Sequence, residues 1–524
     1  MSLNHIELFA GCGGLSLGLE SIGFELLLAN ELSPMAAESF AFNLLNEDLL
    51  EKSKKGQKSS STIWLNSNFS ELSARLRENP FQFPQYNAFG YSDMPSDPQK
   101  LIGKLVVGSI IELNSYIKSN SSLLNNLRNA FGKSGGLDLV SGGPPCQSFS
   151  MAGKRERDND KNSLPWEFAR FVEMVQPKLV LLENVTGILR AFKDDSGKSF
   201  HAWYEVAKVF ASIGYLPLCL HVNARMVGVA QNRPRFIMIG IRHDHYIKIS
   251  SRLTSTESEI FSESETFFSL VKKHGADLPF GHLGYWDSNK KEHLSIFEKT
   301  FLKKLICNKE VSVKDALDDL KINNPTEPSA FVRNLNATFS FLERKDTLKN
   351  HELRKNSDIV RRRFRIYQIL QLLNDKSVAK SVFDILKGNS TFLSNDSWKK
   401  LSRFDFLQRN NELQSFSEKS DLEEYLLEHP TRKQTQKALT PDTPAPAALS
   451  IPDDACHYDE HELRVLTVRE MARIQSFPDS FEFRSKVTTG GQMRKFEVPQ
   501  YTQVGNAVPP LLGKALGETI KYLM

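Results

Sequence analysis

Cysteine is scarce in this sequence, and long apolar runs are missing. The five cysteines are an odd number and include no C-x-x-C pair, so we expect neither a disulfide framework nor a metal site. No apolar run approaches the ~18 residues of a membrane-spanning helix, and the first residues show no charged-then-apolar signal pattern. These absences predict a soluble, cytoplasmic protein.

Charge of one sign is not in large excess either. The 524 residues include 67 Lys and Arg against 62 Asp and Glu, a formal net charge of +5. A mildly basic balance permits a polyanionic partner without requiring one. With 40% hydrophobic and 25% charged residues, the composition is that of a globular protein, and the length suggests two or three domains.

Short apolar runs separated by helix-like segments dominate the first half of the chain. They predict strands at residues 6–9, 26–29, 105–107, 137–140, 179–182 and 236–241. Strands that alternate with helices favour an α/β fold with a mostly parallel sheet covered on both faces. Residues 46–104 are polar and contain several prolines, so we expect an insertion or a surface excursion there.

The pattern changes after residue 241. From 242 to about 463 the chain is more polar, and residues 344–365 hold nine Lys and Arg against three acids. The Pro/Ala-rich segment 440–448 is typical of an extended connector. We therefore expect one α/β domain over residues 1–241, a second domain inserted at 242–463, and a final segment, 464–524, that returns to the first.

A glycine-rich turn, Phe9-Ala10-Gly11-Cys12-Gly13-Gly14, follows the first expected strand. Glycines between a strand and a helix allow positive φ and a close approach to a ligand. The dinucleotide fingerprint is missing, because Ser16 stands where its last glycine is required. Glu31 ends the next strand, where a carboxylate can accept hydrogen bonds from ribose hydroxyls. The pattern suits a ribose-bearing ligand without a pyrophosphate, and a purely structural turn is the alternative.

A single thiol, Cys146, follows a Gly-Gly-Pro-Pro bend at the end of the strand expected at 137–140. A lone cysteine is more often an inert core residue than a nucleophile. The bend is rigid, however, and the polar, basic loop 148–160 after it can close over a substrate. The sequence therefore favours Cys146 as a nucleophile.

Charged side chains end or precede two further strands. Glu183 follows the run 179–182, and Gln231, Arg233 and Arg235 share one face at a period of two. Singly, each could belong to an ion pair at a strand end. A thiol, a carboxylate and arginines at strand ends of one sheet indicate a ligand site, because open α/β sheets bind ligands there.

These motifs resemble those of the DNA cytosine-5 methyltransferases, over residues 1–45, 105–241 and 464–524. The matching segments follow in the family's order: Phe9 to Gly14, Asn30-Glu31, Gly143-Pro144-Pro145-Cys146-Gln147, Glu183-Asn184-Val185, Gln231-x-Arg233-x-Arg235, Arg469 to Pro478 and Gln503 to Pro510. The resemblance implies a Rossmann-like S-adenosylmethionine-dependent methyltransferase fold with an inserted, smaller target-recognition domain. By this reading residues 1–241 and 464–524 are catalytic, and 242–463 bind DNA.

The resemblance also implies the reaction. A methyl group passes from S-adenosylmethionine to carbon 5 of a flipped-out cytosine in a specific duplex sequence. The Cys146 thiolate adds to carbon 6 of the ring. Glu183 contacts the ring's N3 and amino group, Arg235 holds its carbonyl, and Arg233 supports the site or a phosphate.

The same matching assigns the remaining site residues. Those expected around the cofactor are Phe9, Gly11, Gly13, Gly14, Leu15, Glu31, Ser109, Ile110, Pro145, Leu164 and Asn506. Ser109 departs from the family pattern, which has an Asp there for the adenine amino group, so its hydroxyl or a water would have to substitute. Those expected at the DNA are Gln147, Ser148, Ser150, Gln231, Arg361, Arg362 and Arg363, although a basic run is usually a solvated face.

Several alternatives remain open. A methyltransferase of exocyclic amino groups needs an aromatic residue where Cys146 stands. A tRNA-methylating relative, an inactive DNA-binding scaffold and a nicotinamide oxidoreductase are the other readings. The sequence shows no nuclease module, so a cognate restriction endonuclease of a bacterial restriction–modification system would be a separate protein. We expect a monomer that acts on double-stranded DNA.

Overall fold

The computed structural model describes residues 2–145, 164–193, 199–306, 309–342, 347–431, 436–447 and 449–524. In this part of the chain the main feature is a nine-stranded sheet with the order β11-β9-β10-β6-β5-β1-β2-β4-β3. Every strand expected from the sequence lies in this sheet, which confirms the α/β class. Its strands are β1 (Leu3–Leu8), β2 (Phe24–Glu31), β3 (Thr62–Trp64), β4 (Lys104–Val107), β5 (Leu139–Gly142), β6 (Leu179–Val185), β9 (Tyr215–Asn223), β10 (Pro234–Arg242) and β11 (Trp286–Asp287).

One strand of this sheet runs against the others. β1 pairs in parallel with β2 and β5, and parallel pairs continue to β3 at one side and β6 at the other. β10 is antiparallel to both β6 and β9. The first residues of β10 therefore lie at the edge where the parallel strands end, and Arg235 stands opposite Val185 of β6.

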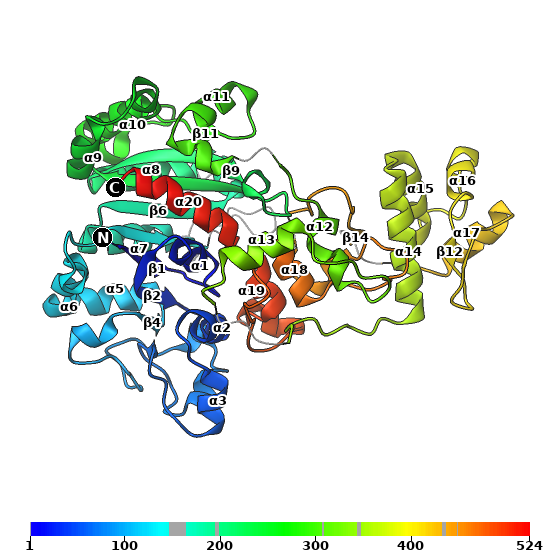
Figure 1. The fold of residues 1–524 in the computed structure, drawn as a ribbon, viewed down its shortest axis with the longest axis horizontal. Helices are drawn as coiled ribbons and strands as arrows, with labels where there is room; N and C mark the ends of the chain where they lie inside the picture. Colours follow the sequence, from blue (N-terminus) through cyan, green and yellow to red (C-terminus); the bar gives the residue numbers. More distant parts are fainter. Residues whose placement is uncertain are drawn as a thin grey trace.

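Helices cover both faces of the sheet (Figure 1). Right-handed crossovers put α1 and α5 on opposite faces, because the chain steps one way from β1 to β2 and the other way from β4 to β5. One layer holds α5 (Ile110–Ser119), α6 (Ser121–Arg128), α7 (Leu164–Val175) and α8 (Ala202–Ser212). The other holds α1 (Gly14–Glu20), α2 (Pro34–Leu44) and α20 (Pro510–Tyr522).

The last helix of the chain packs directly on the first. α20 crosses α1 so closely that a Cβ at Gly18 would lie 2.5 Å from the carbonyl oxygen of Pro510. Glycine is therefore required at this crossing. The chain end thus lies within the main body, beside its N-terminal helix (Figure 1).

Residues 243–305 also belong to this body. They form α9 (His243–Ser250), α10 (Ser255–His274), β11 and α11 (Lys291–Lys299). Phe261 and Phe267 of α10 and Phe301 are buried in the same core as β9 and α8. The structure therefore differs from the domain boundary expected at residue 242, because the apolar face of α10 was concealed within a polar segment.

Two smaller cores follow along the chain. The first joins α12 (Val313–Leu317) and α13 (Ala330–Thr338) to α18 (Val468–Ile474) and α19 (Gln500–Asn506). The second core lies in a unit that projects away from the sheet (Figure 1). That unit, here the arm, contains α14 (Asp358–Leu373), α15 (Lys376–Leu386), α16 (Asn395–Leu401), α17 (Lys419–Leu427), and the strand pairs β12 (Phe406–Leu407) with β13 (Leu413–Gln414) and β14 (Lys437–Ala438) with β15 (Ala455–Cys456).

The polar segment 46–103 is more than a surface excursion. It forms α3 (Leu49–Lys54), α4 (Leu72–Arg75) and the edge strand β3. Trp64 of β3 is fully buried in a small core that also contains Leu49 and Leu72. A few well-spaced apolar residues are therefore enough to attach this insertion to the sheet.

Among the described residues, no helix combines the length and the apolar character needed to cross a membrane. In the same residues no three His, Cys, Asp or Glu side chains gather as a metal would require.

Candidate active site

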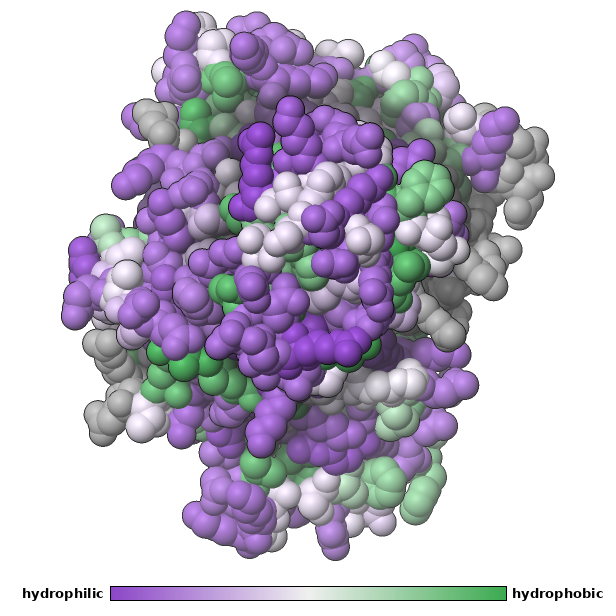
Figure 2. All heavy atoms as spheres, turned by 90° about the vertical axis from the view of Figure 1, so that its right-hand side faces the viewer, coloured by the Kyte–Doolittle hydropathy of each residue, from purple (hydrophilic) through white to green (hydrophobic). Residues whose placement is uncertain are grey.

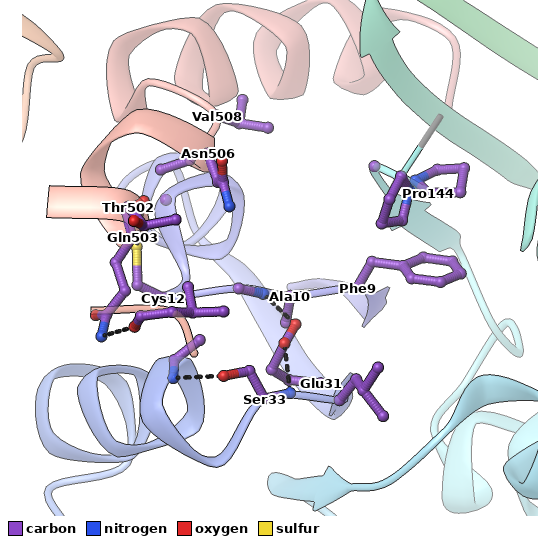
Figure 3. A pocket seen from close by; sticks show the side chains of 18 of the residues that line it. Phe9, Ala10, Cys12, Glu31, Ser33, Pro144, Thr502, Gln503, Asn506 and Val508 are labelled. Atoms are coloured by element: carbon purple, nitrogen blue, oxygen red, sulfur yellow. Dashed lines mark hydrogen bonds between the residues drawn. The ribbon is translucent and has the colours of Figure 1, made fainter. Parts of the chain in front are cut away.

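A cavity of about 540 Å³ opens at the carboxyl ends of the parallel strands. Its lining comes from the turns after β1, β2, β4, β5 and β6, from the start of β10, and from residues 494–508 (Figure 3). This is the edge at which open α/β sheets bind ligands. Ten of the predicted cofactor residues line it, namely Phe9, Gly11, Gly14, Leu15, Glu31, Ser109, Ile110, Pro145, Leu164 and Asn506.

The eleventh, Gly13, has a packing role instead. Its backbone has φ +95°, and a Cβ there would lie 2.5 Å from Cδ1 of Leu44 in α2. Its neighbour Gly14 is equally confined, since a Cβ would lie 2.2 Å from the carbonyl oxygen of Val508. The turn is thus pressed between α2 and the end of α19, whereas a Cβ at Gly11 would meet nothing within 4 Å.

Glu31 is held rigidly at the floor of the cavity. Its Oε2 accepts a hydrogen bond from the Gly11 N–H at 2.8 Å, and its Oε1 accepts one from the Ser33 N–H at 2.8 Å (Figure 3). Burial raises the pKa of the Glu31 carboxyl, although these donors oppose the rise. Each oxygen keeps a further lone pair, so the carboxylate can accept hydrogen bonds from a pair of ligand hydroxyls.

Ser109 is the N-cap of α5. Its Oγ accepts a hydrogen bond from the Ile111 N–H at 3.2 Å, which satisfies an otherwise unpaired donor of the helix. The same residue lines the cavity. Its hydroxyl proton remains available for a ligand, so the helix cap and the ligand use different parts of one side chain.

Glu183 and Arg235 form a buried ion pair beside the thiol's strand. Arg235 Nε lies 2.6 Å from Glu183 Oε1, and the two side chains are 9% and 12% exposed. Burial lowers the pKa of Arg235, and the Glu183 charge opposes that shift. Both residues line the cavity. The sequence pattern predicts that Glu183 and Arg235 lie side by side if their strands are neighbours. In the structure β6 and β10 are neighbours.

Arg233 ties β10 to the last motif of the chain. Its Nη2 donates to the carbonyl oxygens of Gly505 at 2.7 Å and Ala507 at 3.1 Å. Burial lowers the pKa of Arg233 well below its usual value, and the charge of Arg235 lowers it further. Arg233 therefore fixes the wall of the cavity.

Gln231 is fully buried, and its amide donates to the carbonyl oxygen of Pro446 at 3.0 Å. Its backbone forms a bridge with Ala445. This places Gln231 in the packing between β10 and the connector, and not on a surface open to DNA. Unlike Arg233 and Arg235, Gln231 does not line the cavity, and no local pattern indicates that the connector covers it.

Cys146, Gln147, Ser148 and Ser150 lie outside the described residues. The described chain reaches Pro145, and the bend before the thiol lines the cavity (Figure 3). The amide of Asn184 donates to the carbonyl oxygen of Pro144 at 3.0 Å. Asn184 thereby fixes the bend at Pro144, a role that the sequence pattern did not reveal.

The basic run on α14 is largely engaged within the arm. Arg361 donates to Asp358 Oδ1 at 3.1 Å, and Arg363 donates to the carbonyl oxygen of Pro430 at 2.8 Å. Arg362 Nη2 lies 3.5 Å from the carbonyl oxygen of Arg409. Arg365 is buried and pairs with Glu460 at 2.7 Å. Much of this charge therefore supports the arm's own fold.

Two parts of the lining were missed by sequence reasoning. One is Pro80-Phe81 in the insertion, and the other is the run from Arg494 to Val498 before α19. Both lie in loops without periodic patterns. Spacing alone offered no signal for either.

Comparison with known proteins identifies the family. The family model described as C-5 cytosine-specific DNA methylase matches residues 3–65 and 125–522, which is most of the chain. The Type II methyltransferase M1.HphI of Haemophilus parahaemolyticus is 25% identical over 99% of this chain and 87% of its own length. The Type II methyltransferase M.DdeI of Desulfomicrobium norvegicum is 24% identical over 99% of this chain and 89% of its own length.

Among solved structures, an E. coli protein described as a DNA modification methyltransferase encoded within a prophage aligns with a TM-score of 0.46 and 18% identity. It covers 100% of this chain and 99% of its own. The family match includes the strands that carry Glu31, Glu183 and Arg235. The chain therefore belongs to the C-5 cytosine-specific DNA methylase family and is a DNA cytosine-5 methyltransferase.

Proposed function

We propose that this protein methylates carbon 5 of a flipped-out cytosine in a specific duplex sequence, with S-adenosylmethionine as methyl donor and a covalent Cys146 adduct. Its setting would be a bacterial restriction–modification system, as for the Type II relatives. The observation that carries the proposal is that the Glu183–Arg235 pair and the Glu31 carboxylate line one cavity. A nucleoside site and a base-binding pair are thereby within reach of each other.

The cavity residues fit this donor. A volume of about 540 Å³ lies in the range of ligand pockets, roughly 300–1,000 Å³. The fixed Glu31 oxygens suit the two ribose hydroxyls. Asn506, an exposed amide at the end of α19, can bond the amino acid portion, and the open space at Gly11 allows a close approach of the ligand.

Carbon 5 of cytosine is a poor nucleophile, and the proposed chemistry overcomes this. The Cys146 thiolate adds to carbon 6, which makes carbon 5 enamine-like. S-adenosylmethionine would supply the methyl group that carbon 5 takes and would leave as S-adenosylhomocysteine. A water would take the proton from carbon 5, and the thiolate would then leave carbon 6, which restores the ring and the free Cys146.

Glu183 and Arg235 bind the base during these steps. One oxygen of the Glu183 carboxyl group accepts a hydrogen bond from the amino group, the other donates to N3 when the carboxyl is protonated, and the Arg235 guanidinium donates to the ring carbonyl. Because the pair is already fixed at 2.6 Å in a buried site, little reorganisation is needed when charge develops on the ring. Arg233 holds this wall in place from behind through the carbonyls of Gly505 and Ala507.

DNA binding is assigned to the face between the main body and the arm. A base cannot react inside the stack, so it must be flipped out at a cost of a few kcal/mol. We place the target-recognition domain at about residues 306–465, since residues 243–305 pack on the sheet. The outer end of the arm, which faces the viewer in Figure 2, is mostly hydrophilic. In this proposal the enzyme is a monomer, and any cognate endonuclease is a separate protein.

The deciding experiment maps cytosine methylation at base resolution in plasmid DNA from cells that express the protein. Wild type should produce 5-methylcytosine at one fixed short motif, and Cys146→Ala should produce none. Cys219→Ser, which changes a buried thiol far along the sheet on β9, serves as the matched control and should retain the motif. If the plasmid DNA stays unmodified and tRNA is methylated instead, the substrate is RNA and not duplex DNA.

A further inference from the structure

One wall of the cavity is supplied by a segment outside the family model. Pro80 and Phe81 line the cavity, as does the run that carries Arg494 and Phe496. The family model matches residues 3–65 and 125–522, so it leaves out the insertion that carries Phe81. No motif of the sequence assigns this residue a role.

Topology explains why the insertion reaches the cavity. It leaves β3, the outermost strand of the sheet, whose partner β4 runs parallel to it. Parallel strands all end at the edge where the cavity lies. The chain after Trp64 therefore emerges next to the end of β4, which carries Ser109. This is the nucleoside end of the cavity, since Glu31 ends the adjacent strand β2.

Phe81 is held in place by its own segment. The Asn79 side chain accepts a hydrogen bond from the Phe81 N–H at 3.1 Å. The Asn68 amide donates to the carbonyl oxygen of Gln82 at 2.8 Å, and the Glu78 carboxylate accepts from the Asn68 N–H at 2.9 Å. The turn Pro80–Gln82 is thus fixed on both sides, while 54% of the Phe81 surface is exposed.

The insertion is also tied to the segment that leads to Arg494. Arg77 donates to Glu38 Oε2 at 3.3 Å and to Ser485 Oγ at 3.0 Å. The Ser485 N–H donates to the other oxygen of Glu38 at 3.2 Å. Ser485 begins the loop that leads to Arg494, so both segments share α2 as a common support. Because the backbone that carries the ring is already fixed, it loses little entropy when a flat ligand packs on the ring.

We propose that Phe81 is a cofactor-binding residue that packs against the adenine of the methyl donor and closes the nucleoside end of the cavity. This inference rests on the proposed function, because Glu31 defines that end only if the ligand is a nucleoside. Loss of a base–aromatic contact weakens binding by about fivefold to a hundredfold. The insertion thus adds a contact to the cofactor site beyond those of the family motifs.

The test compares Phe81→Ala with Phe89→Ala in the full chain. Phe89 lies in the same insertion and is 95% exposed, but it does not line the cavity, so it is a matched control. Isothermal titration with S-adenosylhomocysteine should show a dissociation constant raised at least about fivefold for Phe81→Ala and unchanged for Phe89→Ala. Phe81→Tyr should restore binding, because it keeps the ring.

A second ligand locates the contact. 5′-Methylthioadenosine has the nucleoside but lacks the amino acid portion, so Phe81→Ala should weaken its binding by the same factor. Equal affinities of Phe81→Ala and Phe89→Ala, or a loss confined to S-adenosylhomocysteine, would overturn the inference while leaving the proposed function intact. If the wild-type protein binds neither ligand, the proposed function fails as well.

Discussion

The ion pair between Glu183 and Arg235 permits a sharp test of how the site is held. Arg235→Met removes the guanidinium and leaves the Glu183 carboxylate buried, since its side chain is only 12% exposed. Breaking a buried pair from one side costs about 3–5 kcal/mol. Arg233 offsets part of this cost. In the wild-type protein the charge of Arg235 lowers the pKa of Arg233, and Arg235→Met removes that repulsion. We expect a loss of about 3 kcal/mol in the free energy of unfolding.

A double-mutant cycle isolates the pair. Chemical denaturation is measured for wild type, Arg235→Met, Glu183→Gln and the double variant. Because Glu183→Gln removes the unpaired charge, the double variant should be at least as stable as Arg235→Met. The coupling should reach about 2 kcal/mol. Methyl transfer should be lost in all three variants, which separates stability from catalysis.

The same strand provides the control. Arg242 pairs with Asp244 at the far end of β10, where the side chains are 32% and 54% exposed. The corresponding cycle should give less than about 1 kcal/mol, as solvent-exposed pairs do. Additive effects of Arg235→Met and Glu183→Gln, within about 0.5 kcal/mol, would refute the argument that the two side chains stabilise each other.

Three further predictions concern buried groups. Burial raises the pKa of Glu7 from 4.5 to about 8, so the free energy of unfolding should fall as pH rises from 4.5 to 8, and Glu7→Gln should flatten that decline in denaturation at both pH values. Burial opposes ionisation of Glu470, but the Arg464 guanidinium holds the pKa of this carboxyl at about 2. Glu470→Gln should therefore lower the free energy of unfolding by about 3 kcal/mol at pH 7. In denaturation measurements the difference from wild type should shrink as pH falls from 4.5 toward 2. Gly13→Ala should lower the thermal midpoint more than Gly23→Ala, because both have positive φ but only Gly13 meets neighbouring atoms; equal shifts would contradict the packing role.

The parts of the site that could be predicted lie on strands. The buried parallel strands have near-continuous apolar runs, so their ends could be located, and Glu31 and Glu183 were placed at those ends. The period of two then directed Arg233 and Arg235 to the same face. These inferences required only local geometry and the rule that ligands bind at the carboxyl edge.

The parts that could not be predicted depend on distant contacts. β11 has two residues, and β3 has three, which is too short for a periodic signal. Phe81 reaches the cavity because β3 pairs with β4, a pairing that no local pattern encodes. The burial of Gln231 likewise depends on the connector at Pro446, which lies more than 200 residues away.

The contacts of the last motif explain how a large inserted unit can coexist with a fixed site. Gly14 presses on Val508, and Arg233 bonds the carbonyls of Gly505 and Ala507, so the final segment locks the glycine turn to β10. The connector returns beside the start of the inserted unit, because the Val313 N–H donates to the carbonyl oxygen of Thr443 at 3.0 Å and the Lys314 N–H donates to that of Pro441 at 3.0 Å. Entry and exit of the inserted unit therefore lie side by side. The arm can differ in size and sequence without moving the cavity, because the strands that carry Glu183 and Arg235 precede the arm in the chain and are paired within the sheet.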